Sequence, residues 1–172
     1  TLNVAATGAQ CYRLFKDIDA TFANKCLQVA ERAWEAAKRN PNEILPEGVY
    51  NTGSGEYGDT KLGDEFQWAA AELYISTGKQ HYANDINLGS LTSTDYNWQD
   101  TGLAGVMSLA TVPTNHTAGL MAEARQKLQG IADHRVNISN TQGYLTPINE
   151  NEFIWGSNNV IANDLSVIGL VY

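Results

Sequence analysis

Two groups of side chains in this sequence could carry chemistry: one pair of adjacent carboxylates, and several aromatic residues beside polar loops. The carboxylates are Asp64 and Glu65, which follow the glycine-rich, acidic stretch 55–63. Two carboxylates together with carbonyl oxygens from such a loop suit a hard cation such as Ca²⁺. The alternative is that both residues only begin a helix, where unpaired amide N–H groups favour negative charge. Spacing alone favours this second interpretation.

The aromatic residues suit carbohydrate recognition. Sugar rings present apolar C–H faces that pack on indole and phenol rings, and their hydroxyl groups need polar partners. Trp98 and Trp155 each lie beside a polar loop, so we favour a binding role for these two. Trp34 and Trp68 lie on predicted helix faces, and we expect them in the core.

Other reactive residue types indicate no site. His81, His116 and His134 do not have the spacing of metal ligands, and no Ser–His–Asp arrangement supports nucleophilic catalysis. Three further loop carboxylates are expected to be solvated: Asp59, Asp95 and Asp100.

Composition limits the class of protein and its partners. The chain has 172 residues, of which 43% are hydrophobic and 17% charged, as in ordinary globular proteins. The net charge of −8 and the lack of a basic cluster argue against a nucleic-acid partner. No apolar run approaches the roughly 18 residues of a membrane helix, so we expect no membrane partner either.

Cys11 and Cys26 fall on two successive predicted helices joined by a short turn. If the helices are antiparallel, the two residues are about equally far from that turn and could be level with each other. A disulfide is therefore possible, but we favour two buried free thiols.

Hydrophobic periodicity predicts a series of helices joined by connections of alternating length. The expected helical ranges are 2–16, 19–39, 64–77, 80–88, 101–110, 117–134 and the apolar segment 158–172. Connections are short at 17–19, 77–80 and 111–116, and long at 40–63, 89–100 and 136–157. Alternate connections of stacked helical hairpins lie at the same end, so the three long loops should share one face. That face should carry the aromatic residues of the loops: Tyr50, Tyr57, Trp98, Tyr144 and Trp155.

Four segments, in the right order, resemble glycoside hydrolase family 9, the cellulase family. The most specific is DEFQWAAAELY at 64–74, followed by Thr77-Gly78, which looks like the family's DEFYWAAAELYxxTG stretch. The other segments are AERAWEAAK at 30–38, NWQD at 97–100, and WGSNN at 155–159 with a terminal LVY. They are similar to the family's AEKAWEAAKANP, SWDD and WGSLRY…ALVY segments. The likeness covers essentially the whole chain and is closest to bacterial cellulosomal cellobiohydrolases.

The resemblance implies an all-α fold that is part of an (α/α)6 barrel, a toroid of αα-hairpins with long loops on one face. It also implies inverting hydrolysis of β-1,4-glucan by an acid–base pair of carboxylates. The family's DAGD motif and its late glutamate after an NPHHR-type motif do not occur in this sequence. We therefore expect 1–172 to be the central portion of one catalytic domain, incomplete at both ends. Alone it should be inactive and, with the apolar run 165–172 uncovered, prone to associate.

The resemblance also assigns sugar contacts. Trp98 and Trp155 match tryptophans that line sugar subsites, and Tyr57 and Tyr144 are expected to assist. Asn159 stands where the family has the arginine of WGSLR, so a charged substrate contact is replaced by an amide. The implied partners are a β-glucan or cellulose oligosaccharide and the rest of the catalytic domain, in a secreted, extracellular, cellulosome-associated protein.

The same resemblance reverses the preference at the carboxylate pair. Asp64 and Glu65 match a pair that helps to hold a structural Ca²⁺ behind the cleft loops in relatives, so we expect a Ca²⁺ site. Gln99 replaces the first aspartate of SWDD, which is a Ca²⁺ ligand in relatives.

A second hypothesis is a helical-repeat scaffold for protein interaction, without catalysis. Such repeats keep a fixed period of about 34 residues with short loops. Here the two hairpins that echo each other, around Phe15 and around Tyr74, are roughly 60 residues apart, which favours the hydrolase.

Overall fold

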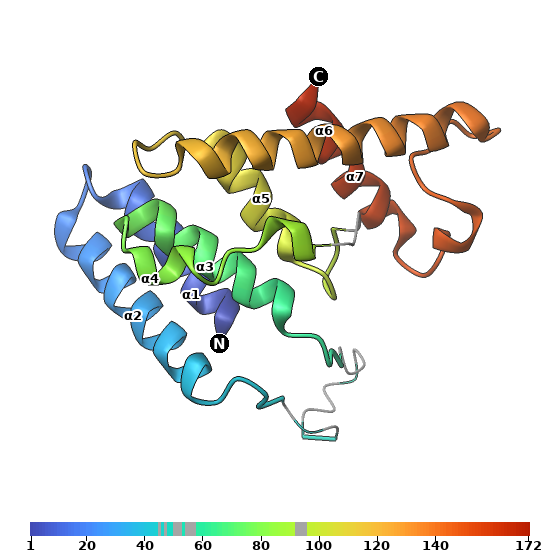
Figure 1. Ribbon diagram of the computed structural model, residues 1–172. Coiled ribbons are helices and arrows are strands. Elements are labelled where there is room, and N and C mark those ends of the chain that lie inside the picture. Colours follow the sequence, from blue (N-terminus) through green and yellow to red (C-terminus); the bar gives the residue numbers. More distant parts are fainter. Residues whose placement is uncertain (45, 47, 50–52, 54–57, 92–95) are drawn as a thin grey trace.

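The computed structural model describes residues 1–172 except 45, 47, 50–52, 54–57 and 92–95, and all its regular elements in the described ranges are helical (Figure 1). They are α1 (Leu2–Phe15), α2 (Ala20–Arg39), α3 (Gly63–Thr77), α4 (Gln80–Ala83), η1 (Leu88–Ser90), α5 (Gly102–Thr111), α6 (Ala118–Thr141), η2 (Glu150–Glu152) and α7 (Ser157–Val171). Within these ranges, no helix combines the length and apolar character that crossing a bilayer requires.

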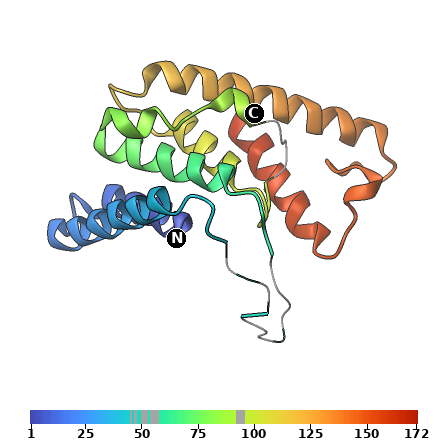
Figure 2. The same cartoon turned by 60° about the horizontal axis from the view of Figure 1, so that its bottom comes forward.

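The long helices pack as a series of neighbours in the order α2, α1, α3, α5, α6 and α7. Helix α1 packs on α2 and α3, α3 on α5, α5 on α6, and α6 on α7. Figures 1 and 2 show α1 and α2 on one flank, α6 and α7 on the other, and α3 with α5 between them. Small residues permit the close approaches: a Cβ at Gly8 would lie 3.0 Å from that of Ala30, and one at Gly105 would lie 3.0 Å from the Cα of Trp68.

The predicted separation of short and long connections is confirmed. In Figure 1 the turns after α1, α3 and α5 lie at the left, while α3, α5 and α7 begin and α6 ends farther to the right, and α2 ends at the lower centre. Two predicted helix ends are also confirmed. Asp19 caps α2 by accepting a hydrogen bond from the Phe22 N–H (2.9 Å), and α3 stops at Gly78, whose φ is +68°.

The predicted helix 80–88 is wrong after Ala83. Beyond that residue the backbone finds partners outside a helix: the Asn87 N–H donates to Oε1 of the buried Gln67 (3.1 Å). The Asn87 side chain then accepts from the Ser90 N–H (3.2 Å) and begins η1. Local Asn chemistry and one tertiary contact therefore replace the last turn of the expected helix.

The expected end of a helix at His134 and the loop from 136 are also corrected, because α6 continues to Thr141. Arg135 and Ile138 are buried in this extension, on the same face as Ile131 of the preceding turn. The sequence around them is polar, and an arginine in such a stretch is expected to be solvated. Only the structure shows that Arg135 has buried partners. The third long loop is thus shorter than predicted and begins at 142.

A buried glutamate joins three helices. Glu72, in α3, is fully buried, and its carboxylate pairs with Arg13 of α1. It also accepts hydrogen bonds from Gln10 (2.8 Å), from Trp68 (3.1 Å) and from Ser108 of α5 (2.6 Å). A buried charge is tolerated only when it is paired and hydrogen-bonded in this way.

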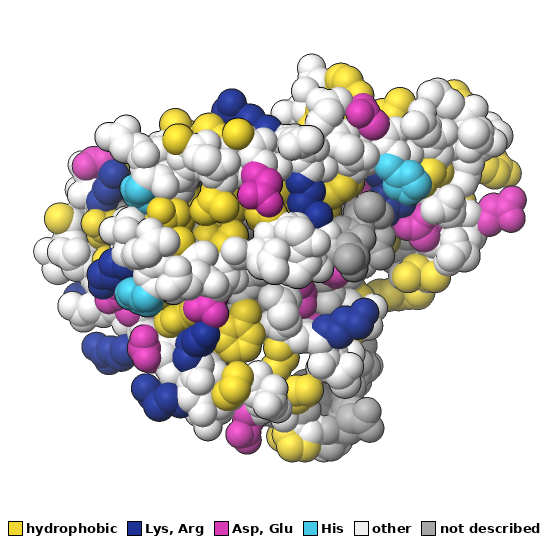
Figure 3. Space-filling model, in the orientation of Figure 1, with side chains coloured by type: hydrophobic (Ala, Val, Ile, Leu, Met, Phe, Trp, Pro, Cys, Tyr) yellow, Lys and Arg dark blue, Asp and Glu magenta, His cyan; other side chains and the backbone are white. Residues whose placement is uncertain are grey.

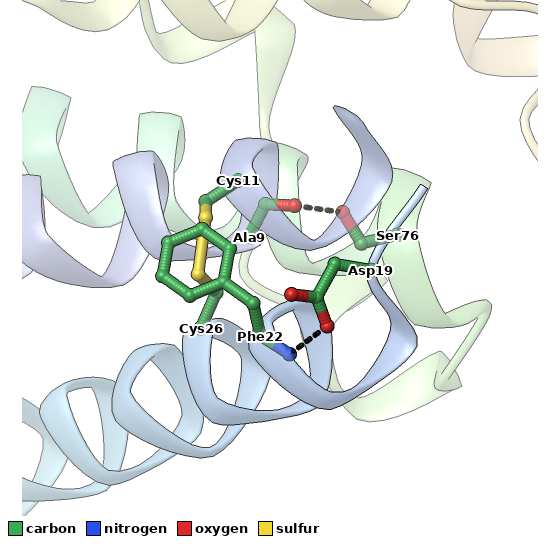
Figure 4. The surroundings of a disulfide bond; sticks show 6 residues. All are labelled: Ala9, Cys11, Asp19, Phe22, Cys26 and Ser76. Atoms are coloured by element: carbon green, nitrogen blue, oxygen red, sulfur yellow. Dashed lines mark hydrogen bonds between the residues drawn. A yellow bond between two sulfur atoms is a disulfide. The ribbon is translucent and has the colours of Figure 1, made fainter. Parts of the chain in front are cut away.

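Cys11 and Cys26 form a disulfide between α1 and α2, so the preference for free thiols is wrong (Figure 4). The two helices approach closely at Gly8, and the Cα atoms of the cysteines are 5.9 Å apart, within the usual range for a disulfide. Near this end of the hairpin the ring of Phe22 packs edge-on against that of Phe15, with centroids 5.0 Å apart. The two cysteines lie level with each other on the antiparallel helices, as expected. The short distance between the helices allows them to form a disulfide.

We expect Glu72→Ala to lower the free energy of unfolding by about 3–5 kcal/mol, because it leaves Arg13 without its charge partner inside the structure. Urea denaturation measures the change. Asp85→Ala is the matched control: it removes a more exposed pair with Lys38 and should cost at most about 1 kcal/mol. Equal, small effects of both substitutions would contradict a central role for Glu72.

We expect Cys11→Ala/Cys26→Ala to lower the free energy of unfolding by about 3 kcal/mol, because the bridge closes a loop across a sequence separation of 15 residues in the unfolded chain. Wild-type protein in dithiothreitol should show the same loss, and the double variant should be insensitive to the reductant. A denaturation midpoint of the wild type that does not respond to reduction would refute the bridge.

Candidate functional site

Three carboxylates converge where α3 begins. Asp64 and Glu65 occupy the first turn of the helix, and Asp59 lies in the segment before it. One carboxylate oxygen from each of the three lies within 4.8 Å of the others. The Lys61 N–H donates to Asp59 (3.0 Å), and this turn brings the aspartate towards the helix.

Burial and mutual repulsion shape the chemistry of this cluster. Burial first, then a hydrogen bond with Asp64 and the charges of Asp64 and Asp59, raise the pKa of Glu65 to about 8. One oxygen of Glu65 and one of Asp59 are buried without a hydrogen-bond partner in the described part of the chain. Clustered carboxylate oxygens that lack donors are a donor set for a hard cation, so the residues present fit a metal such as Ca²⁺.

Asp59 is the residue that sequence reasoning missed, since it was expected to be solvated. The available signal was its place two residues before Lys61, in a turn that folds back on α3. That signal is weak by itself, because aspartates favour turns everywhere.

Asp64 also ties the start of α3 to the start of α5. Its Oδ2 atom accepts hydrogen bonds from the Thr101 N–H (2.7 Å) and hydroxyl (3.2 Å). The chains are so close here that a Cβ at Gly102 would lie 2.6 Å from Leu91 and 3.3 Å from the Cβ of Asp64. The acidic cluster therefore fixes the position of the turn that precedes α5.

That turn presents Trp98. Asn97 closes it, because its side chain accepts from the N–H groups of Gln99 (2.8 Å) and Asp100 (3.1 Å). Its own N–H donates to the Asp100 carbonyl (3.0 Å). Trp98 lies at the tip of this turn and is 48% exposed. A rigid turn with an accessible indole is a suitable platform for a sugar ring.

Helix α7 meets the same turn. Asn163 donates from its side chain to the Tyr96 carbonyl (2.6 Å), which holds the turn against the helix. Trp155 precedes α7 and is 90% exposed, and Gly156, with φ +80°, redirects the chain from it into the helix. Asn159 is exposed in the first turn of α7. The structure thus joins the elements that carry three of the predicted sugar contacts.

The remaining residues named from the sequence are exposed, buried in the core, or outside the described residues. Tyr144 is 86% exposed and lines a concavity between the end of α6 and η2. Trp34 is buried against Phe66 and Tyr82, as expected for the core, and Trp68 belongs to the Glu72 network. Three residues named from the sequence lie outside the described residues: Tyr50, Tyr57 and Asp95.

Surface charge is mixed on the face shown in Figure 3, where basic side chains alternate with acidic ones. Within the described part of the chain, two lysines form ion pairs, Lys38 with Asp85 (2.7 Å) and Lys79 with Glu31 (2.5 Å). This face is therefore unlike the continuous basic surface that phosphate recognition requires.

Comparison with known proteins gives concordant matches. The family model for glycosyl hydrolase family 9 matches residues 1–172. The chain is 38% identical over 200 residues to cellulose 1,4-beta-cellobiosidase of Acetivibrio thermocellus, covering 100% of this chain and 22% of that protein. It is 33% identical over 179 residues to endoglucanase C of Cellulomonas fimi, covering 100% and 16%. The chain thus spans about a fifth of the length of these relatives.

Solved structures agree. A metagenome-derived family 9 endoglucanase matches with a TM-score of 0.87 at 25% identity, covering 99% of this chain and 32% of that one. A family 9 protein of Bacteroides ovatus matches with a TM-score of 0.77 at 26% identity, covering 99% and 35%. These structures confirm the predicted fold, an all-α chain that forms part of an (α/α)6 barrel.

Sequence and structure therefore lead to the same assignment. The family model covers every residue of the chain, and the two relatives match along its full length. The helical hairpins and their loop face have the arrangement of the solved family members. The chain belongs to glycosyl hydrolase family 9.

Proposed function

We propose that this chain provides the loop face of a larger catalytic domain that hydrolyses β-1,4-glucan with inversion. One observation carries the proposal: the rigid turn of Trp98 is held against α7, and both Trp98 and Trp155 are accessible on the loop side of a family 9 fold. The relatives named cellobiosidase and endoglucanase point to the same substrate class. The structural neighbour AaCel9A was solved with a cellobiose-like isofagomine.

The chain's own contribution is substrate binding. Exposed indoles at Trp98 and Trp155 stack on glucose rings, and the Asn159 amide exchanges hydrogen bonds with hydroxyl groups. Tyr144 adds a phenol ring on the same loop side, and Tyr57 remains a predicted contact. An interaction scaffold without catalysis finds no support in the relatives, which are glycosidases by name.

The acid and base of an inverting mechanism are a pair of carboxylates on opposite sides of the scissile bond. The sequence motifs that carry them in the family are absent from this chain, and the chain spans only about a fifth of its relatives. We therefore place both groups in other parts of the protein, which are the partners of this segment. The 172 residues alone are then expected to bind without hydrolysing.

The protein acts outside the cell in this proposal. Its substrate class is an extracellular polymer, its relatives are bacterial cellulases, and a disulfide joins α1 to α2. Disulfides persist mainly in oxidising compartments, which agrees with secretion. Association with a cellulosome follows from the family likeness alone.

The acidic cluster is proposed to hold a structural Ca²⁺. Asp64 and Glu65 would bind it, and Asp59 would supply a third carboxylate in a chain where Gln99 replaces an acidic residue of the family. When bound, the ion neutralises the repulsion between the three carboxylates. Asp64 then keeps its hydrogen bonds to Thr101 and holds the Trp98 turn in place.

We expect Trp98→Ala and Trp155→Ala each to weaken binding of a soluble β-glucan about three- to tenfold, because each removes an aromatic surface for a sugar ring. Affinity electrophoresis of the protein in gels containing β-glucan measures the effect. Leu14→Ala, an exposed residue at the opposite end near the α1–α2 turn, is the control and should leave retardation unchanged. Unretarded wild-type protein would defeat the proposed function.

We expect the metal-free protein to lose thermal stability as pH rises from about 4.5 to about 8. The pKa of Glu65 is raised from 4.5 to about 8 on folding, so its stabilising protonated form is lost as pH passes through the higher value. Addition of Ca²⁺ at pH 8 should restore the melting temperature. Melting curves in EDTA and in Ca²⁺ test both effects.

Glu65→Gln should remove both the pH dependence in this window and the response to Ca²⁺. Glu123→Gln, at an exposed position on α6, should behave as the wild type. If calorimetry detects no Ca²⁺ binding to the wild type at pH 8, the metal assignment is wrong.

A further inference from the structure

A concavity of about 850 Å³ opens between the C-terminal end of α6 and η2, in the segment that leads to Trp155. Its lining combines two aromatic rings with hydrogen-bonding side chains: Tyr144, Phe153, Gln142, Asn149, Glu150 and Asn151. Both rings are accessible, since Tyr144 is 86% and Phe153 47% exposed. The acidic cluster and the Trp98 turn belong to other elements, so this is a separate feature of the loop face.

The wall of the concavity is built on buried charges. Arg135 of α6 is 1% exposed, and its Nη1 donates to both carboxylate oxygens of Glu152 (2.9 and 3.1 Å) and to the Pro147 carbonyl (3.4 Å). Its Nε lies 3.3 Å from a carboxylate oxygen of the buried Asp164 in α7. One cation thus anchors the segment around η2 to both neighbouring helices.

Glu152 completes this frame. Its Oε2 accepts hydrogen bonds from the Asn149 backbone N–H (2.6 Å) and side chain (2.8 Å). Burial acts to raise the pKa of Glu152, but these bonds and Arg135 outweigh it and lower the pKa, so the carboxylate stays charged. The position of Asn149 is therefore fixed before any ligand binds, which reduces the entropy cost of binding.

The opposite rim is held in an unfavourable backbone conformation. Leu145 has φ +54°, and it is the non-glycine residue with positive φ in the described part of the chain. The left-handed region is unfavourable for such a residue, because its Cβ approaches the following carbonyl oxygen. Its N–H donates to the Gln142 carbonyl (3.2 Å), which closes the turn that presents Tyr144. Such strain concentrates at sites that bind ligands.

The lining selects the chemistry of the ligand. None of the described residues that line the concavity is basic, which disfavours a phosphate or another anion. Amide groups of Gln142, Asn149 and Asn151 can both donate and accept, as neighbouring hydroxyl groups require. Two aromatic rings beside such groups suit the apolar face and polar edge of an uncharged sugar ring.

We propose that this concavity is an additional pyranose subsite, at which Tyr144 and Phe153 hold a glucose unit of the same β-glucan chain that Trp155 binds. The inference rests on the proposed function, and continuity supports it: Phe153 and Trp155 are two residues apart on one segment, and Figure 1 places that segment on the loop side. The subsite extends the length of glucan that the protein recognises.

The test is calorimetric titration of the protein with cellohexaose. Tyr144→Ala and Phe153→Ala should each raise the dissociation constant about three- to tenfold, with unchanged melting temperature, because each removes one exposed ring. The matched control is Ile154→Ala, a neighbour of Phe153 that is 62% exposed but does not line the concavity. It should bind as the wild type.

Trp155→Ala distinguishes failure of the additional subsite from failure of the proposed function. If it weakens cellohexaose binding while Tyr144→Ala and Phe153→Ala bind as the wild type, the additional subsite is refuted and the proposed function stands. If the wild type does not bind cellohexaose, both fall. Equal weakening by the ring variants and by Ile154→Ala would show a general disturbance of the loop and would also refute the subsite.

Discussion

The carboxylate of Glu72 is the constraint on which the rest of the structure depends. It is fully buried in the middle of α3, and it can remain there only because α1 supplies Arg13 and Gln10 and α5 supplies Ser108. These partners require both helices to lie directly against α3. The alanines and glycines of the same faces allow that approach, so charge pairing and small side chains specify one packing together.

A fixed α3 positions the loop end of the molecule. Its first turn carries Asp64, which holds Thr101 and with it the turn of Trp98. Asn163 then connects that turn to α7, the helix that follows Trp155. The chain of contacts runs from a buried ion pair to exposed indoles through hydrogen bonds of polar side chains to the backbone.

The two ends of the helical array have different physical roles. The short-turn end is closed by local devices: the Asp19 cap, the left-handed Gly78 and the bridge between Cys11 and Cys26. The loop end keeps carboxylates, exposed aromatic rings and a concavity framed by Arg135. The loop end therefore carries the groups that we propose to bind a ligand, as loops held by a rigid scaffold commonly do.

Hydrophobic spacing and turn residues by themselves determined the helices, their alternating connections and the common face of the long loops, because helix periodicity and capping are local properties. Local pattern could not reveal Asp59 in the acidic cluster, the continuation of α6 through Arg135, or the loss of helix after Ala83. Each depends on a partner distant in sequence or on the fold of a turn. The cysteine bridge likewise required the distance between α1 and α2, which small residues set. Tertiary structure decided these points because a polar side chain takes its role from the group it meets, and only the packed helices bring that group within reach.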